Sequence, residues 1–482
     1  MEVLQRTANR GSISTGGYEI DNSVKFEADN REYLRWTNFS SQASAARKKK
    51  FTFSVWVKRT ELDIQQIFIS TSQNGYLTFE ANNQLTWIQQ YGGSQLVINT
   101  TRVFRDTAAW YHIMVVVDTA QSTEADRTKI YVNGVQETVF DAAAYPSQNA
   151  EASNLFEQHL IVGEWGGTQN GFCGYMADYY FLSETAASPT DLGEFDEDSG
   201  IWKPKAYSGT ISSPSHFLEF KDGSDLGTAT AGLDSDYQNN LTAADQATDT
   251  PTNNFCTFNP LQTVRLNTGS GHKWTISNGA TSAIQAADYG YMTHAGNIGF
   301  KKGKWYAEFK AGTGTSQAGV GMNQLDNTGA WEESYIGAYA NATAIGMCKS
   351  QDGYFYRNGG SGALGVSWAA GDILGIAIVI NDDGTGFMGM SKNGTWENSQ
   401  NPSSGTSGML GLYYGNALPA HLFHSFAVWT RRNNGAMLAN FGGFPGFTIS
   451  SANADANGYG NFEYAVPTGY YALCTKNLEE FG

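Results

Sequence analysis

The chain has 482 residues, of which only 16% are charged, and it carries a formal net charge of −16. A chain of this length exceeds one ordinary hydrophobic core and predicts two or three domains. The negative net charge argues against binding of a nucleic-acid backbone, because clustered lysine and arginine residues are needed to neutralise the phosphates. The one basic run, residues 47–50, precedes a predicted strand and indicates a solvated loop. An electrostatic contact for an acidic partner is the alternative.

Glycine and aromatic residues are abundant, with 55 Gly, 27 Phe, 25 Tyr and 12 Trp. This composition favours many short strands joined by turns, and it predicts an all-β fold. The four cysteines are scattered and form no Cys-x-x-Cys pair, so they indicate buried free thiols rather than a zinc site. The N-terminus lacks the apolar core of a signal peptide, and the apolar run 373–380 is too short to span a bilayer. We therefore expect synthesis in a cytoplasm and no membrane insertion.

The first half begins with a polar, glycine-containing stretch, residues 1–16, which predicts an extended N-terminal arm. The predicted strand Phe51–Lys58 has apolar residues on one face and Trp56 on the other, so we expect both of its faces to be buried. Turn residues separate the segments regularly, as in an antiparallel sandwich. The other strands predicted here are Ser23–Phe26, Tyr33–Trp36, Gln66–Thr71, Gly75–Glu80, Gln84–Gln89, Gln95–Asn99, Tyr111–Asp118, Thr128–Val132, His159–Gly163, Gly174–Leu182 and Phe217–Phe220.

Two domains follow from a change in composition near the middle of the chain. Residues 221–255 are rich in Asp, Ala, Thr, Asn and Gly and predict an irregular linker between a sandwich at 17–220 and a second at 256–482. Residues 441–482 are expected to pack back as an irregular tail. The strands predicted in the second half are Lys273–Ser277, Gly303–Ala311, Gln317–Met322, Tyr335–Ala340, Gly353–Arg357, Ile373–Asn381, Gly386–Lys392 and His424–Val428.

An Asn-Gly hairpin signature occurs once in each half. In both copies an apolar strand is followed by a polar stretch and by a second strand that ends on Asn-Gly, at 133–134 and at 393–394. Asn-Gly supplies two residues that tolerate positive φ, which a two-residue hairpin turn requires. The repetition predicts two sandwich modules in series, with Asn133 and Asn393 as turn residues rather than ligands.

These segments resemble two known families. The first half is similar to concanavalin-A-like, laminin-G-type lectin domains, through residues 51–58 (FTFSVWVK), 110–112 (WYH), 129–134 (KIYVNG) and 174–178 (GYMAD). The second half resembles a SPRY domain, through residues 303–309 (GKWYAEF), 319–321 (GVG), 371–376 (GDILGI) and 392–394 (KNG). The resemblance implies two tandem antiparallel β-sandwiches, a concanavalin-A-like jelly roll and a SPRY-like sandwich, preceded by the extended arm.

The pairing of these modules is similar to structural proteins of tailed phages, notably marine ones. The segments that carry this likeness are residues 249–255 (DTPTNNF) and 469–475 (GYYALCT). The resemblance implies a non-enzymatic virion appendage, such as a tail fibre, receptor-binding protein or head-surface fibre. Its implied partners are other virion proteins and a host-surface glycan or protein, and it allows a homo-oligomer. An architectural or decoration protein that binds only virion subunits is the alternative.

A glycan hydrolase is a further alternative, because glycosidases also use the concanavalin-A-like sandwich. The nearest match to their paired carboxylates is Glu194-Phe195-Asp196-Glu197-Asp198, which has Asp where the final Glu belongs. It lies in a turn-rich segment, which favours a solvated acidic loop. His112 lies inside an apolar strand, where a hydrogen-bonded core imidazole is expected rather than a general base. The chain is therefore predicted not to be an enzyme.

Calcium is an open question at this stage, and the alternative is a protein with no cofactor. Laminin-G-type and lectin sandwiches often hold one Ca²⁺ at the rim of a sheet, since this cation prefers oxygen ligands. Asp118 and Asp178 end or follow strands and Asp126 lies in a loop, so these three carboxylates are the candidates.

Aromatic residues in glycine-rich loops are the candidate binding site. A sugar presents a C–H face that stacks on an aromatic ring, and its hydroxyls need amide or carboxylate partners nearby. Three segments offer both kinds of side chain, with rings that cap the sandwich core as the alternative. The candidate ligand-binding residues are Trp165, Gln169, Asn170, Trp331, Glu332, Tyr335, Tyr354, Tyr356 and Arg357.

Overall fold

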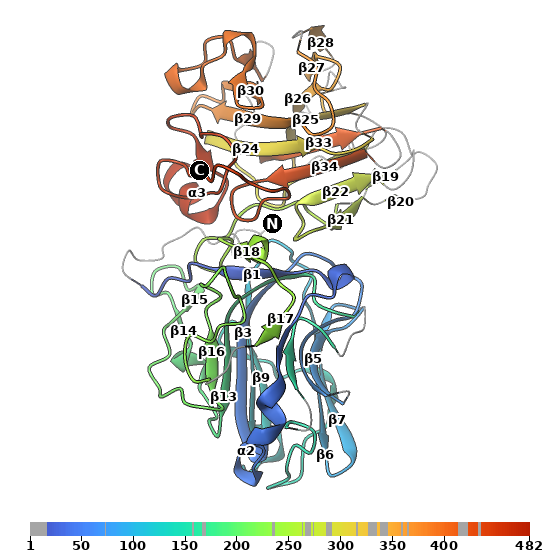
Figure 1. Cartoon of the computed structure of the whole chain (residues 1–482), viewed down its shortest axis with the longest axis vertical. Helices are drawn as coiled ribbons and strands as arrows, with labels where there is room; N and C mark the ends of the chain where they lie inside the picture. The colour runs from blue at the N-terminus through green and yellow to red at the C-terminus, as the bar shows by residue number, and fades with distance from the viewer. Residues whose placement is uncertain are drawn as a thin grey trace. The chain divides into compact units, whose positions relative to one another are not determined.

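The computed structural model divides into two compact units, Met1–Thr252 and Asn253–Gly482 (Figure 1). It describes residues 17–482 except 73, 157–158, 166–169, 234–236, 263, 266–270, 273, 286–291, 315–316, 326–334, 338–345, 358–359, 364–365, 413–422 and 432–434. Both units consist mainly of antiparallel β-sheets within these residues, which confirms the all-β prediction. The predicted arm, residues 1–16, lies outside the described residues.

Two sheets of eight strands build the described part of the first unit. One has the order β10-β9-β8-β3-β13-β1-β18, with β16 against β13: Val135–Gln136, Thr128–Val132, Tyr111–Asp118, Lys50–Arg59, Gly174–Ser183, Ser23–Phe26, Gln246–Ala247 and His216–Leu218. The other has the order β11-β7-β6-β5-β4-β12-β2-β17: Phe140–Ala143, Ser94–Val103, Gln84–Tyr91, Gly75–Phe79, Gln66–Ser72, Leu160–Val162, Leu34–Trp36 and Gln238–Asn239. The other described elements are a short hairpin, β14 (Gly193–Phe195) and β15 (Trp202–Pro204), a helix, α2 (Ala45–Lys49), and short 3-10 helices.

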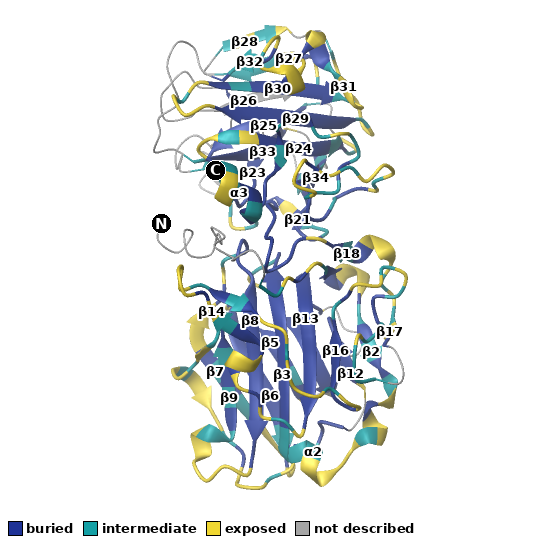
Figure 2. Ribbon diagram, turned by 90° about the vertical axis from the view of Figure 1, so that its left-hand side faces the viewer, coloured by how far each residue is buried: buried dark blue, intermediate teal, exposed yellow. Residues whose placement is uncertain are grey.

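Strand β3 shows how the sequence produces this sandwich. Successive side chains of a strand point to opposite faces. Phe53 and Val55 therefore point to the main core of the unit, while Ser54 and Trp56 point the other way. Both sets are buried, as predicted, and Figure 2 shows β3 and its neighbour β13 in the colour of buried residues.

The second unit repeats the plan with different strands. One sheet has the order β21-β22-β34-β24-β29-β30-β31, with β32 against β30 and β35 parallel to β24: Thr275–Ser277, Ser282–Gln285, Gly435–Asn440, Gly303–Ala311, Ile373–Ile380, Gly386–Lys392, Thr395–Trp396, Leu410–Gly411 and Tyr471–Ala472. The other has the order β23-β33-β25-β26-β27-β28: Met292–Ala295, His424–Thr430, Ala318–Gln324, Gly346–Ser350, Tyr354–Arg357 and Gly360–Ala363. A separate pair is β19 (Val264–Arg265) with β20 (Gly271–His272).

The two Asn-Gly hairpins have the same geometry. Asn133 and Gly134 have φ of 49° and 76°, and Asn393 and Gly394 have φ of 48° and 78°. In the first copy the Asn133 side-chain oxygen accepts a hydrogen bond of 2.8 Å from a neighbouring backbone N–H, that of His112. The Asn393 oxygen does the same for Ile373, also at 2.8 Å. The asparagine thus makes the turn and fastens it to the adjacent strand.

Replacing Gly134 by alanine is expected to lower the free energy of unfolding by about 1–3 kcal/mol, because a positive φ disfavours a Cβ and the site is filled. A Cβ there would come within 2.4 Å of the Trp202 ring. Gly92 is the matched control, since its φ of +53° is similar but nothing lies within 4 Å of its Cβ position. Urea denaturation of both variants measures the difference, and equal losses would contradict the role of the ring contact.

Most of the segment predicted as a linker packs with the first unit. Its short strands β17 and β18 extend the two sheets of that unit, which continues to Thr252. Asp249 is buried there and accepts a hydrogen bond of 2.7 Å from Lys58 Nζ and one of 3.1 Å from the Trp110 indole. Asp249 therefore helps to anchor this segment, together with the buried side chains of Leu226 and Tyr237.

The C-terminal segment belongs to the second unit and is more regular than the irregular tail that the sequence predicts. It contributes β35 and the helix α3 (Thr475–Phe481). The buried Glu308 carboxylate of β24 accepts the backbone N–H groups of Glu463 and Tyr464, both at 2.8 Å. In the part of the chain that the structure describes, no helix is long and apolar enough to cross a membrane.

Candidate functional site

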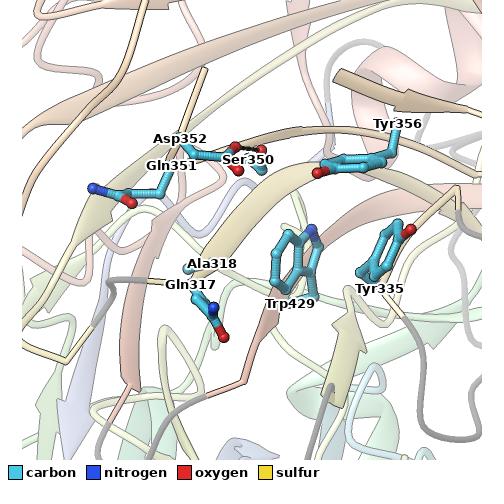
Figure 3. Close-up of a pocket in the computed structure, with 8 residues that line it drawn as sticks. All are labelled: Gln317, Ala318, Tyr335, Ser350, Gln351, Asp352, Tyr356 and Trp429. Atoms are coloured by element: carbon cyan, nitrogen blue, oxygen red, sulfur yellow. Dashed lines mark hydrogen bonds between the residues drawn. The ribbon is translucent and has the colours of Figure 1, made fainter. Parts of the chain in front are cut away.

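A pocket of about 70 Å³ lies on the outer face of the second sheet of the second unit (Figure 3). The residues that line it come from β25, β26, β27, β33 and the adjoining turns. They are Gln317, Ala318, Tyr335, Ser350, Gln351, Asp352, Tyr356 and Trp429.

The register of the sheet explains this hollow. Trp429 of β33 pairs with Gly319 of β25, and Gly319 pairs with Ser350 of β26. Residues directly opposite one another point to the same face of a sheet. Because Gly319 carries no side chain, the face is open between the Trp429 ring and the Ser350 hydroxyl.

Three aromatic rings form one wall of the pocket. The Tyr335 and Tyr356 ring centroids lie 4.6 Å apart at 60°, and those of Tyr335 and Trp429 lie 5.7 Å apart at 44°. Figure 3 shows Tyr335 and Trp429 side by side, with Tyr356 next to them. Trp429 is 4% exposed and packs with Ala427 and Ile336 in a small apolar cluster. Tilted rings in contact hold one another in place.

Polar side chains form the opposite rim. Asp352 Oδ1 accepts hydrogen bonds from the Ser350 hydroxyl and from the backbone N–H of Tyr354, the latter at 3.3 Å. Gln351 Nε2 donates to the Trp368 carbonyl at 2.8 Å, and Gln317 Oε1 accepts from the Arg431 guanidinium at 3.2 Å. These bonds orient the rim, and among the described residues they leave Asp352 Oδ2, Gln351 Oε1 and Gln317 Nε2 for a ligand.

The structure brings together two of the predicted ligand-binding residues, Tyr335 and Tyr356. Tyr354 is two residues from Tyr356 on the same face of β27 and is 44% exposed beside the pocket. Arg357 lies on the other face, where its guanidinium donates to the Gly411 carbonyl, and it does not line this pocket. Trp331 and Glu332 lie outside the described residues.

The predicted loop of the first unit forms a separate feature. Trp165 packs near Tyr76, with ring centroids 6.0 Å apart, and Asn170 Nδ2 donates to Gln65 Oε1 at 3.1 Å. Gln169 lies outside the described residues. Trp165 and Asn170 therefore belong to another surface than the aromatic pocket.

The carboxylates considered for glycosidase chemistry have structural partners. Lys203 Nζ lies 3.3 Å from Glu194 and 3.4 Å from Asp196, across the β14–β15 hairpin. Asp196 Oδ1 also accepts the Ser199 hydroxyl at 2.8 Å and its backbone N–H at 2.9 Å. The segment is a three-residue strand and a tight turn, not only the loop that we expected. Its acidic side chains hold that turn together.

His112 is a core imidazole, as predicted. The Trp202 indole N–H can only donate, so Nδ1 accepts its 3.0 Å hydrogen bond, and Nε2 lies 2.8 Å from the Ser54 hydroxyl. The ring also stacks on Trp56, with centroids 4.8 Å apart. Burial lowers the pKa of His112 to about 3, which holds the ring neutral at physiological pH.

The three carboxylates considered for calcium do not share a site. Asp118 lies opposite Lys50 of β3, whereas Asp178 lies in a bulge opposite the stretch between Ser54 and Trp56. About five residues along β3 separate them, which is about 16 Å. Asp118 is 3.2 Å from Lys50 Nζ, and the third candidate, Asp126, is 2.9 Å from Lys129 Nζ.

One cluster of the described residues has three metal-ligand atoms close together. Glu27, Glu61 and Cys173 place a carboxylate oxygen each and a sulfur within 4.8 Å of one another. The Cys173 thiol lies 3.6 Å from Glu27 Oε1 as a donor and accepts the Ala28 N–H at 3.4 Å. Burial raises the pKa of Glu61 to about 7, and the negative charge of Glu27 adds to this effect. The hydrogen bonds of the Cys173 thiol with Glu27 and Ala28 hold the cluster in place.

Part of the first unit matches the model of a known protein family. Residues 30–191 match the laminin-G model of the concanavalin A-like lectin/glucanases superfamily. The first unit is similar to a lectin-type sandwich. No curated protein matches the chain.

Solved structures that resemble the chain include SPRY domains and a pentraxin. A human SPRY domain has 15% identity and a TM-score of 0.25, covering 34% of this chain and 93% of that chain. The SPRY domain of human HERC1 has 13% identity and a TM-score of 0.27, covering 38% and 96%. A pentraxin from Limulus polyphemus has 14% identity and a TM-score of 0.25, covering 36% and 81%. These likenesses concern the fold alone.

Proposed function

We propose that this chain is a non-enzymatic binding protein that attaches to host-surface glycan through the aromatic pocket of its second unit. The pocket carries the proposal because it joins the two kinds of group that a sugar requires. The rings of Tyr335, Tyr356 and Trp429 provide an apolar wall, and Asp352 and Gln317 provide hydrogen-bonding groups at its rim. Recognition sites of this kind combine apolar surface with a few placed polar groups.

The setting that we propose is the surface of a virion. The resemblance of the paired sandwiches to tailed-phage structural proteins supports it, and the lectin-type first unit is compatible with a binding role. Other virion proteins are then the partners that hold the chain in place. In the alternative, a purely architectural protein, the same sandwiches would bind only other virion subunits and no glycan.

Binding of the isolated protein to host cells and to a glycan array tests this function. Tyr356→Ala is expected to weaken glycan binding about tenfold, because it removes a half-buried ring from the wall that the sugar would cover, and about 1.4 kcal/mol of lost contact corresponds to tenfold. Tyr33→Ala, a partly exposed tyrosine of the first unit, serves as the control and should bind as the wild type does. Blank arrays together with no cell binding would contradict adhesion and favour the architectural role.

A further inference from the structure

The charge of the aromatic pocket restricts the sugars that it accepts. Of the described residues that line it, Asp352 alone carries a formal charge, and that charge is negative. The nearby Arg431 guanidinium donates to Gln317 Oε1 and is not part of the lining. Resting on the function proposed above, we propose that the pocket binds a neutral pyranose at the end of a glycan and rejects acidic sugars.

The hydrogen-bonding groups of the rim favour a hydroxylated ligand. Asp352 Oδ2 and Gln351 Oε1 are acceptors, whereas Gln317 Nε2 is a donor. A hydroxyl group both donates and accepts, so neighbouring hydroxyls of one sugar satisfy all three positions. A sugar carboxylate only accepts, and it would meet the negative charge of Asp352, an exposed carboxylate at the rim of the pocket.

The apolar wall and the volume of the pocket restrict which sugar ring can bind. The rings meet at 60° and 44°, so the wall that they form is angled rather than flat. Stacking needs a sugar face made of axial C–H bonds, which glucose-type rings with equatorial hydroxyls provide. A hollow of about 70 Å³ holds part of one ring, so the ligand enters by its terminal residue.

Titration of the full chain by ligand-observed NMR tests this specificity. The probes are the methyl glycosides of glucose, galactose and N-acetylglucosamine, against those of glucuronic acid and N-acetylneuraminic acid. We expect at least one neutral glycoside to bind tenfold or more tightly than either acidic one. Asp352→Asn is expected to weaken that neutral glycoside about tenfold, because it removes a charge-assisted hydrogen bond. The same variant should reduce the discrimination against glucuronic acid.

Asp383→Asn is the matched control, because Asp383 is an exposed carboxylate in the turn between β29 and β30 of the other sheet. It should leave both affinities unchanged. Binding that depends on Tyr356 but favours the acidic glycosides would overturn this inference and leave glycan recognition in place. The inference also fails if Asp352→Asn binds all five probes as the wild type does. If no glycoside binds and a peptide occupies the pocket instead, both proposals are wrong.

Discussion

Replacing Asp249 by alanine is expected to lower the free energy of unfolding of the first unit by about 3–5 kcal/mol. Asp249 Oδ2 lies 2.7 Å from Lys58 Nζ, and the two side chains are 1% and 0% exposed. Removing one partner of such a pair leaves the other charge poorly compensated in a low-dielectric interior. Calorimetry should show the transition of the first unit lowered by about 10 °C, since a domain of this size shifts about 2–4 °C per kcal/mol.

Two controls separate the buried pair from a general effect of lost charge. Glu137→Gln breaks the pair between Arg102 and Glu137, in which the arginine is 46% exposed, and should cost less than about 1 kcal/mol. The double variant Lys58→Met with Asp249→Leu removes both charges and should recover much of the stability lost by the single change. A single variant within 1 kcal/mol of the wild type, or a double variant as unstable as the single one, would contradict the argument.

This anchor shows what the composition of a segment does not reveal. Residues 221–255 contain few large apolar side chains, so a sequence pattern indicates a linker. Their attachment to the first unit depends on the pairing of β17 and β18, on two buried side chains, Leu226 and Tyr237, and on two ion pairs. Asp245 pairs with Lys25 and Asp249 with Lys58, the latter about 190 residues away in the chain. Such polar contacts between distant residues leave no local periodicity.

The hairpins were predictable because their chemistry is local. Asn133-Gly134 and Asn393-Gly394 set the turn by their own backbone preferences, and the flanking strands follow. Strand β34 was missed for the opposite reason. It contains Gly, Ala and Asn, which are depleted in strands, yet it lies in the middle of a sheet between β22 and β24. Pairing along both edges and burial of Met437 and Ala439 in the core overrode the intrinsic preference.

The candidate site was predicted in part. Tyr335 and Tyr356 were selected as aromatic residues near glycine-rich segments, and both line the pocket. The same pattern does not indicate Trp429, because no glycine-rich loop surrounds it. Alternation in β33, with Phe426 and Val428 in the core and Trp429 on the other face, is the signal that could have identified it. The pairing that brings Trp429 beside Gly319 required the structure.

Lowering the pH from 7 to 5 is expected to destabilise the second unit by about 4 kcal/mol, through two buried histidines at about 2 kcal/mol each. Burial lowers the pKa of His294 to about 3 and that of His424 to about 4, from 6.5. At a pH between the folded pKa and 6.5, each histidine is protonated in the unfolded chain and neutral in the folded one. Stability is therefore complete above the unfolded pKa of 6.5 and is lost as the pH falls toward the folded pKa.

The surroundings of these two rings disfavour protonation of the histidines in the folded state. Neither nitrogen of His294 or His424 has a hydrogen-bond partner among the described residues. His294 instead packs against Phe258 and Trp274, with ring centroids 5.4 and 5.8 Å away. An imidazolium there would lose its hydration and gain no anion. Glu308 opposes the trend, because burial raises its pKa and protonation then favours the folded state.

The first unit should lose less stability than the second as the pH falls, so the two units of one chain can be compared directly. Burial lowers the pKa of His112 to about 3 and that of His216 to about 4, so both destabilise the unit as the pH falls. Burial also raises the pKa of Asp178 to about 8 and that of Glu61 to about 7. These carboxyls bind a proton more tightly when folded, so they add stability as the pH falls through 8 to 5 and offset the histidines.

Calorimetric scans at pH 7, 6 and 5 should therefore show the transition of the second unit falling further than that of the first. His294→Phe and His424→Phe are expected to flatten the pH dependence of the second unit, because each removes one group that must stay neutral. His159→Gln, at an exposed position, is the control and should not change the comparison. Equal shifts of the two transitions, or an unchanged slope in both phenylalanine variants, would show that other groups control acid unfolding. A flattened slope would identify the two unpartnered rings as the acid-sensitive part of the sandwich that carries the proposed glycan pocket.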